Sequence, residues 1–147
     1  MIPTLKSNIR RCNIYQTLCV KTKCDNAIKY NYSILDESKN IVSTVNIYDF
    51  QMKNFDWLLM SDLQTAPKQR NKGYASRLIH KAIDDFLNNS FCKGIYLFVK
   101  KNNGNAIHLY HKLGFEKLKT YKLQDGDYLI MINGNADISQ FNNMQFS

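Results

Sequence analysis

One short stretch of this sequence constrains the fold more than any other: residues 67–79, PKQRNKGYASRLI. The largely apolar run at 57–65 before it is typical of a strand, and Pro67 ends that strand because proline cannot donate to a sheet ladder. Residues 74–88 after it repeat apolar side chains at three- and four-residue spacing, which is typical of one buried helix face. We therefore expect a strand, a polar basic loop and a helix in direct succession.

The loop and the helix start have the chemistry of an anion site. Backbone N–H groups in the first helical turn lack intrahelical partners, and together with the helix dipole they attract negative charge. Gly73 has no Cβ, so a ligand can approach the backbone closely there. Arg70 and Lys72 add positive charge. The alternative is a solvated helix start with incidental basic residues, because a short glycine motif is weak without context.

The chain before this stretch predicts three strands. Residues 28–35 and 41–50 are rich in β-branched and aromatic residues, and the polar segment 36–40 between them is typical of a hairpin turn. Residues 13–22 also favour a strand. A helix is not excluded there, because four residues at helical spacing would share a face: Ile9, Cys12, Tyr15 and Cys19.

The chain after the first helix predicts a central strand, a second helix and a closing hairpin. Residues 95–99, IYLFV, are almost continuously apolar, as in a strand that is buried on both faces. A helix over 106–113 ends at Gly114, which suits the position just past a helix C-terminus. Residues 115–123 and 128–132 then favour two strands joined by a turn.

This order of elements predicts a single α/β (α+β) domain: a mixed sheet with two main helices. The 147 residues are enough for one hydrophobic core, and no internal repeat or long linker divides the chain. We expect residues 1–132 to form the domain and the polar residues 133–147 to form a C-terminal tail.

Positive charge is concentrated around the glycine loop. The formal net charge is +8, and residues 66–122 contain twelve Lys/Arg against three Asp/Glu, a net of +9. A polyanionic partner follows as a hypothesis: a phosphorylated cofactor, a nucleic acid such as RNA, or both.

The remaining composition is that of an ordinary intracellular protein. No apolar run approaches the ~20 residues of a membrane span, and no long apolar segment follows the early basic residues, so a secretory signal is not expected. The four cysteines form no C-x-x-C pair, so no metal site is expected. We therefore expect a cytoplasmic protein with reduced thiols and no membrane partner.

Two motifs occur together in the second half. Residues 70–75, RNKGYA, fit R/Q-x-x-G-x-G/A, and residues 103–115, NGNAIHLYHKLGF, roughly fit N-x-x-A-x-x-L-Y-x-K-x-G-F. In this order, and on these elements, they resemble the GNAT superfamily of acetyl-CoA-dependent N-acetyltransferases. The resemblance covers about residues 28–132. It implies a GNAT-like, mostly antiparallel mixed sheet whose central strands splay apart.

The resemblance also implies which residues hold acetyl-CoA. The strand before the loop would pair with the pantetheine arm through Leu63, Gln64 and Thr65. Asn103 matches the family's cofactor-contacting asparagine, and Tyr110 matches the tyrosine beside the thioester sulfur. Backbone N–H groups at seven positions would hold the pyrophosphate: Arg70, Asn71, Lys72, Gly73, Tyr74, Ala75 and Ser76.

The implied reaction is direct attack of a neutral primary amine on the acetyl group. The backbone N–H of Thr65 or Leu63 would stabilise the oxyanion, and Tyr110 would protonate the departing thiolate as general acid. Asp62 is a candidate base, although strand alternation places it on the opposite face from Leu63 and Thr65. Positioning of the reactants alone supplies much of such a rate, so no dedicated base is required.

The sequence departs from the family in three places. Ala75 replaces the more usual second glycine, and Asn71 stands where a glycine is frequent. The N-terminal helix pair of the family is apparently absent, because only residues 23–27 separate the first two expected strands. Either residues 1–22 supply the missing wall of the acceptor site differently, or the site is open. An open, basic acceptor site would suit a macromolecular amine, either a protein or an RNA-linked amine.

Three functions stay open at this point. The first is acetyl transfer to a primary amine of unknown identity, small or macromolecular, with a homodimer also possible. The second is a catalytically inactive, acetyl-CoA-binding GNAT-like protein. The third is a basic nucleic-acid-binding module, although no helix-turn-helix, RNA-recognition or zinc signature is present.

Overall fold

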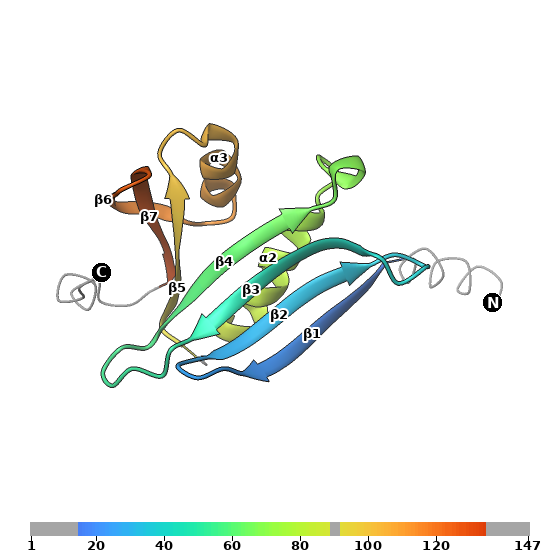
Figure 1. Cartoon of the computed structure of the whole chain (residues 1–147), viewed down its shortest axis with the longest axis horizontal. Helices are drawn as coiled ribbons and strands as arrows, with labels where there is room; N and C mark the ends of the chain where they lie inside the picture. Colours follow the sequence, from blue (N-terminus) through green and yellow to red (C-terminus); the bar gives the residue numbers. More distant parts are fainter. Residues whose placement is uncertain (1–14, 89–91, 135–147) are drawn as a thin grey trace.

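In the part of the chain that the structure describes, two α-helices pack on one seven-stranded sheet (Figure 1). The computed structural model describes residues 15–88 and 92–134. The strand order is β1-β2-β3-β4-β5-β7-β6, and within these residues β4–β5 is the one parallel pair. The prediction of a mixed, mostly antiparallel sheet with two main helices is confirmed. The strands are β1 (Gln16–Lys23), β2 (Ile28–Leu35), β3 (Ile41–Asp49), β4 (Trp57–Thr65), β5 (Gly94–Lys100), β6 (Glu116–Leu123) and β7 (Gly126–Gly134).

Short polar turns join β1, β2 and β3 into an antiparallel meander. The N–H of Cys24 donates to the Ala27 carbonyl at 2.8 Å in the first turn. In the second turn, Oδ1 of Asp36 accepts from the N–H groups of Ser38 and Asn40, both at 2.9 Å. The strand interpretation of residues 13–22 is therefore confirmed from residue 16 onward, and the helical alternative is wrong there. No helix lies between β1 and β2, because their connection is this short turn.

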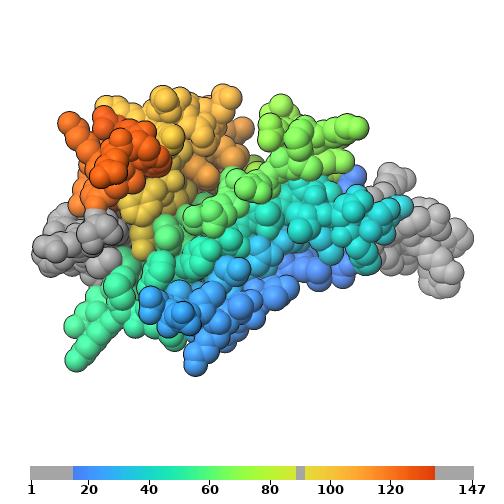
Figure 2. All heavy atoms as spheres, in the orientation of Figure 1, coloured from blue at the N-terminus to red at the C-terminus, as the bar shows by residue number. Residues whose placement is uncertain are grey.

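β4 and β5 pair at their N-terminal ends and then separate. Their register begins with Trp57 opposite Gly94 and ends with Leu59 opposite Tyr96, although both strands continue well beyond this point. The two arrows spread apart in Figure 1, and the space-filling view shows a notch between the yellow-orange part of the molecule and the green loop (Figure 2). The splayed central strands expected from the resemblance are confirmed.

The two faces of the sheet carry separate hydrophobic clusters. On one face, α2 (Tyr74–Ile83) buries Leu78, Ile79 and Ala82 against alternate residues of β2, β3 and β4. We call this the main core, and α3 (Gly104–Lys112) packs against it further along through Ala106, Ile107 and Tyr110. The second cluster centres on three aromatic residues beside the β4–β5 junction: Phe55, Trp57 and Tyr96.

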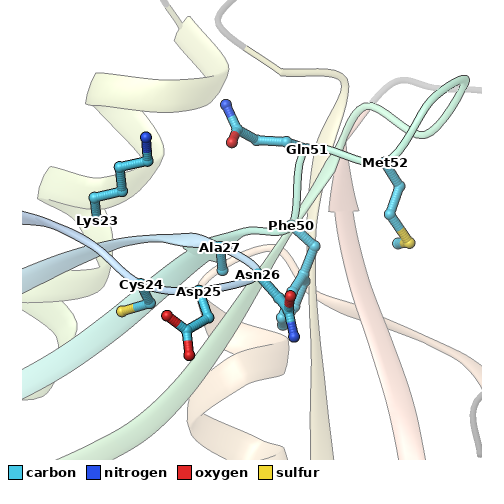
Figure 3. Close-up of a pocket in the computed structure, with 8 residues that line it drawn as sticks. All are labelled: Lys23, Cys24, Asp25, Asn26, Ala27, Phe50, Gln51 and Met52. Atoms are coloured by element: carbon cyan, nitrogen blue, oxygen red, sulfur yellow. The ribbon is translucent and has the colours of Figure 1, made fainter.

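An open hollow lies at the end of the sheet where β4 begins. It is lined by the end of β1 and the turn after it, residues 23–27, and by residues 50–52 after β3. The polar ends of Lys23, Asp25 and Gln51 point in different directions rather than toward one centre (Figure 3). This hollow is at the opposite end of β4 from the glycine loop.

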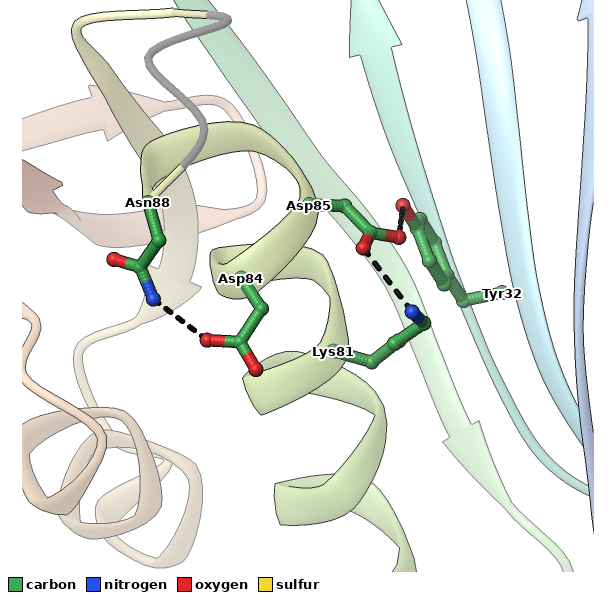
Figure 4. Close-up of polar contacts among 5 residues, drawn as sticks. All are labelled: Tyr32, Lys81, Asp84, Asp85 and Asn88. Carbon is green, nitrogen blue, oxygen red and sulfur yellow. Dashed lines mark hydrogen bonds and ion pairs between the residues drawn. The ribbon is translucent and has the colours of Figure 1, made fainter.

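The helix that begins at Tyr74 spans the predicted segment 74–88, but its last part is wider than an α-helix. After Ile83 it continues as a π-helical turn, η2 (Asp84–Asn88), which buries Phe86. Asp85 in η2 joins the helix to the sheet, because its Oδ2 accepts from the Tyr32 hydroxyl at 2.7 Å. Its Oδ1 pairs with Lys81 at 3.1 Å (Figure 4). Burial, followed by this hydrogen bond, raises the pKa of Tyr32, so its hydroxyl stays protonated and donates.

The remaining boundaries differ from the predictions by one or two residues. β5 takes in Gly94 and Lys100, α3 begins at Gly104 rather than at 106, and β7 continues to Gly134. The predicted tail, 133–147, thus starts inside a strand. Residues 1–14 and 135–147 lie outside the described part of the chain.

Replacement of Gly94 by alanine is expected to destabilise the protein by about 1–3 kcal/mol, as overpacking of a core does. A Cβ at Gly94 would overlap the six-membered ring of the Trp57 side chain. Chemical denaturation of Gly94→Ala measures the loss. The matched control is Gly104→Ala, because a Cβ at Gly104 meets nothing within 4 Å in a helix that favours alanine. An equal loss of unfolding free energy in the two variants would contradict the conclusion that the Trp57 ring leaves no room for a side chain at residue 94.

Removal of the Tyr32 hydroxyl is expected to cost about 1–2 kcal/mol of unfolding free energy, because the hydrogen bond to a carboxylate is lost next to the main core. Tyr32→Phe tests this by urea unfolding. Lys81→Ala removes a second, more exposed partner of Asp85 and is expected to cost about 0.5 kcal/mol or less. A larger effect for Lys81→Ala would show that the ion pair, rather than Tyr32, holds η2.

Candidate functional site

The loop between β4 and α2 is held in a fixed shape. A short helical turn, η1 (Pro67–Gln69), follows β4, and Nε of Arg70 donates to the Thr65 carbonyl at 3.2 Å. Asn71 and Gly73 both have left-handed backbone angles, with φ of 62° and 84°. Asparagine is one of the few residues besides glycine that adopts this conformation readily, which explains why Asn71 can stand where the family often has glycine.

The first turn of α2 presents its backbone N–H groups without a side-chain cap. Gly73 is the N-cap residue and makes no capping hydrogen bond, and a Cβ there would meet nothing within 4 Å. The N–H groups that follow have no partner within an α-helix. Tyr74 packs its ring on Tyr15 with centroids 5.1 Å apart, and the hydrogen bond between the two hydroxyls is the main cause of the raised pKa of Tyr74. This geometry suits an anion such as a phosphate.

A β-bulge interrupts β4 before this loop. Gln64 pairs with Thr44 and Ser61 pairs with Asn46, so two residues, Asp62 and Leu63, lie opposite one residue of β3. Asp62 has a φ of 59°. Such a bulge disrupts the ladder and turns the strand locally. Regular pairing resumes beyond it, where the Thr65 hydroxyl hydrogen-bonds with the Ser43 hydroxyl at 2.9 Å.

The bulge places the two side chains on opposite faces. Leu63 packs against the main core. The exposed Asp62 carboxylate instead accepts, through Oδ2, from Nδ2 of Asn46 at 3.1 Å and from the Tyr48 hydroxyl at 3.4 Å. Neither partner was foreseen, although alternate polar residues in the strands around residues 31 and 46 were a visible signal of a polar sheet face.

The second motif forms α3, which follows β5. Oδ1 of Asn103 accepts from the Ala106 N–H at 3.2 Å and so caps the helix. Tyr110 is half-buried, with its ring centroid 6.0 Å from that of Phe115. Burial raises the pKa of Tyr110, so its hydroxyl is protonated at neutral pH. The two neighbouring histidines, His108 and His111, are exposed.

The predicted residues therefore fall into three groups around the separation of β4 and β5. Leu63, Gln64 and Thr65 end β4, the residues from 70 to 76 follow directly, and Asn103 and Tyr110 lie on the helix after β5. Asp62 stands on the other face of the sheet from Leu63. None of the residues that line the hollow in Figure 3 belongs to these groups.

In residues 15–88 and 92–134, no three His, Cys, Asp or Glu side chains come together in a way that could hold a metal ion. No helix in that part of the chain has the length and apolar character needed to cross a membrane.

The splayed sheet and the glycine loop at its centre define a class of fold, and comparison with known proteins identifies the family. The sequence profile described as acetyltransferase (GNAT) family matches residues 6–115. The chain belongs to this family.

One curated relative is the spermidine N(1)-acetyltransferase of Vibrio cholerae serotype O1 (strain ATCC 39315 / El Tor Inaba N16961). It is 30% identical over 95 residues, which cover 62% of this chain and 51% of the relative. The chain thus spans about half the length of the curated relative that it matches.

Two solved structures illustrate the range of similar proteins. The dodecameric structure of spermidine N-acetyltransferase from Vibrio cholerae in an intermediate state has a TM-score of 0.62 at 26% identity, covering 81% of this chain and 70% of that one. The NatC complex bound to Gag peptide and CoA has a TM-score of 0.63 at 24% identity, covering 72% and 71%. At that identity the second match shows the fold alone.

Proposed function

We propose that this protein is an N-acetyltransferase that moves an acetyl group from acetyl-CoA to a primary amine in the cytoplasm. One observation supports this most: the separation of β4 and β5 opens beside a glycine loop whose first helical turn is uncapped. Membership of the GNAT family supports acetyl-CoA as the donor. The domain in this proposal extends from the N-terminal region through the end of β7 at Gly134, slightly beyond the predicted limit of 132.

The residues present fit acetyl-CoA. The N–H groups at the start of α2 would hold its pyrophosphate, and Gly73 leaves open space for a phosphate oxygen to approach the backbone. Arg70 and Lys72 are exposed and add positive charge at the same place. The edge of β4 that faces β5 offers backbone groups to the amide-bearing pantetheine arm at Leu63, Gln64 and Thr65, where β4–β5 pairing has ended.

The chain's own groups then have distinct roles. Acetyl-CoA supplies an activated thioester carbonyl for direct attack by a neutral amine. The backbone N–H of Leu63 or Thr65 stabilises the oxyanion, since both residues lie on β4 beyond the point where its pairing with β5 ends. Tyr110 on α3 is the general acid, since its hydroxyl is protonated at neutral pH and it matches the tyrosine beside the thioester sulfur in the family motif. Asp62 accepts the proton from the incoming ammonium, directly or through water.

The acceptor of the related proteins does not decide the acceptor here. Spermidine is named for the Vibrio cholerae enzymes, and a Gag peptide is bound by the NatC complex. Within the described residues, β1 and β2 are joined by a short turn in place of the helix pair of the family pattern, which supports an acceptor larger than a small amine.

Gly73→Ala is expected to weaken acetyl-CoA binding by about tenfold, equivalent to about 1.4 kcal/mol, because the added Cβ would occupy the approach to the helix N-terminus. Titration calorimetry with acetyl-CoA measures the effect. Gly126→Ala is the control, since Gly126 also has a positive φ (137°) and open space around it, but is the first residue of β7, directly after the β6–β7 turn. Both variants should lose stability through backbone strain, and only Gly73→Ala should lose affinity. No binding by the wild type would leave the nucleic-acid-binding alternative.

Tyr110→Phe is expected to lower kcat by about 100-fold, the lower end of what a general acid contributes. Release of free CoA thiol, followed with a chromogenic reagent at saturating acceptor, measures the rate. The Kd of acetyl-CoA should change by no more than about twofold, because the packing of the ring is retained. Tyr128→Phe serves as the control, since the Tyr128 hydroxyl contacts Asp125 on the exposed β6–β7 hairpin. Unchanged kcat in Tyr110→Phe would assign the proton to another group. If the wild-type protein binds acetyl-CoA but releases no CoA thiol with any acceptor, the result would indicate the catalytically inactive, acetyl-CoA-binding alternative.

A further inference from the structure

A continuous row of polar side chains crosses three strands and ends at Asp62. The Ser33 hydroxyl donates to Oδ1 of Asn31 at 2.7 Å, and Nδ2 of Asn31 donates to the Thr44 hydroxyl at 2.9 Å and to Oδ1 of Asn46 at 2.8 Å. Asn46 then donates to Asp62 at 3.1 Å. With Tyr48, which also donates to Asp62, these six residues form what we call the polar ladder: Asn31, Ser33, Thr44, Asn46, Tyr48 and Asp62.

The polar ladder lies on the face of the sheet away from α2. Tyr32 and Ile34 on β2, and Val45 and Ile47 on β3, are buried in the main core with α2. Because side chains alternate along a strand, the ladder residues between them point to the other face. Figures 1 and 2 look onto this face, with β3 and β4 in front of α2. Apart from the buried Ser33, the ladder residues are half-buried or exposed, so a ligand can reach them.

This position relates the ladder to the proposed donor site. The uncapped start of α2 lies on the face of the sheet that carries the main core. The Asp62 side chain lies on the opposite face, although Asp62 directly precedes Leu63 in β4. A donor whose pyrophosphate rests on α2 and whose arm follows β4 through the gap would present its acyl end toward the ladder face. An acceptor amine therefore approaches from the side that Asp62 and its partners occupy.

The ladder offers one negative charge and otherwise neutral hydrogen-bonding groups. Both hydrogen bonds to Asp62 within the described residues end on Oδ2, which leaves Oδ1 to accept from an ammonium. Burial, followed by the charge of Asp62, raises the pKa of Tyr48, so the Tyr48 hydroxyl stays a donor. The residue paired with Tyr48 on β2 is Lys29, a cation. A ligand with one ammonium and neutral polar neighbours fits these groups, whereas a polycation needs several carboxylates.

The pKa of the acceptor amine also favours a ligand with a single ammonium group of low pKa. The α-amine of a peptide has an ordinary pKa of about 7.7–8.0, so roughly a third of it is neutral at pH 7.5. An alkylammonium with a pKa of about 10.4 is neutral in about one molecule in a thousand at that pH. The ladder has a single carboxylate, which is solvent-exposed and already accepts two hydrogen bonds, and it suits the amine that needs least help to lose its proton.

We propose that the polar ladder is the acceptor platform and that it takes the N-terminal α-amine of a peptide in preference to a polyamine. This inference rests on the proposed acetyltransferase function and specifies its substrate class. Asp62 binds the amine, and Asn46 and Tyr48 on β3 are positioning residues that hold the Asp62 carboxylate on the ladder face. An amide or hydroxyl side chain near the peptide N-terminus finds matching groups along Asn31 and Thr44.

A direct competition tests the proposal. The full-length protein is incubated with acetyl-CoA and three acceptors: a short peptide with a free N-terminus and no lysine, the same peptide N-terminally blocked and carrying one lysine, and spermidine. Mass spectrometry and initial rates give kcat/KM for each. The free peptide should exceed spermidine and the blocked peptide by at least about tenfold. Preference for spermidine or for the lysine side chain would overturn the inference while leaving acetyl transfer intact.

Variants of the ladder separate positioning from folding. Asp62→Asn should raise the peptide KM by about tenfold or more with the acetyl-CoA Kd unchanged, and Asn46→Ala should raise it by a smaller factor. Asp56→Asn is the matched control, because Asp56 is an exposed carboxylate paired with Lys93 at the other end of β4. An unaltered peptide KM in Asp62→Asn overturns the inference. Failure to bind acetyl-CoA, or to acetylate any of the three amines, overturns the proposed function and the inference together.

Discussion

The early end of the β4–β5 pairing is the constraint on which the rest of this structure depends. Two parallel strands are joined over three residue pairs and then separate, so the sheet divides into a β1–β4 part and a β5–β7 part. The junction is made firm by the Trp57 ring, which fills the space beside Gly94, where no side chain could fit. Backbone groups of β4 that would face a neighbouring strand are thereby available to a ligand.

Local backbone geometry then decides what meets at this gap. The left-handed angles at Asp62, Asn71 and Gly73 lie before, within and at the end of the loop that leaves β4. The bulge sends Asp62 and Leu63 to opposite faces, and the loop delivers an uncapped helix start to one of them. In the proposed function these two faces serve different substrates: the anionic donor rests on α2, and the amine approaches along the polar ladder. The positive charge near the loop and the single carboxylate on the ladder agree with that division.

Much of the fold was predictable because its signals are local. Turn residues at 24–26 and 36–40, the three- and four-residue spacing after Tyr74, and the apolar run at 95–99 each predict an element from neighbouring side chains alone. The glycine loop and the second motif likewise indicated the donor site. The π-helical turn, the bulge and the partners of Asp62 were not predictable, because each depends on residues that are distant in sequence. Asp85 meets Tyr32 across 53 positions, and Asp62 meets Asn46 across 16.

The sequence by itself determined the order of strands and helices, the position of the glycine loop and the family to which the chain belongs. These follow from side-chain periodicity and from residues such as Gly73 whose backbone freedom is a property of the residue. Only the tertiary structure decided that β4 and β5 separate after Leu59 and that Asp62 lies on the face away from α2. The tertiary structure also brings polar residues of three strands into one hydrogen-bonded row. The physical reason is that strand register and bulges are set by pairing between distant segments, and a shift of one residue would move each of these side chains to the other face.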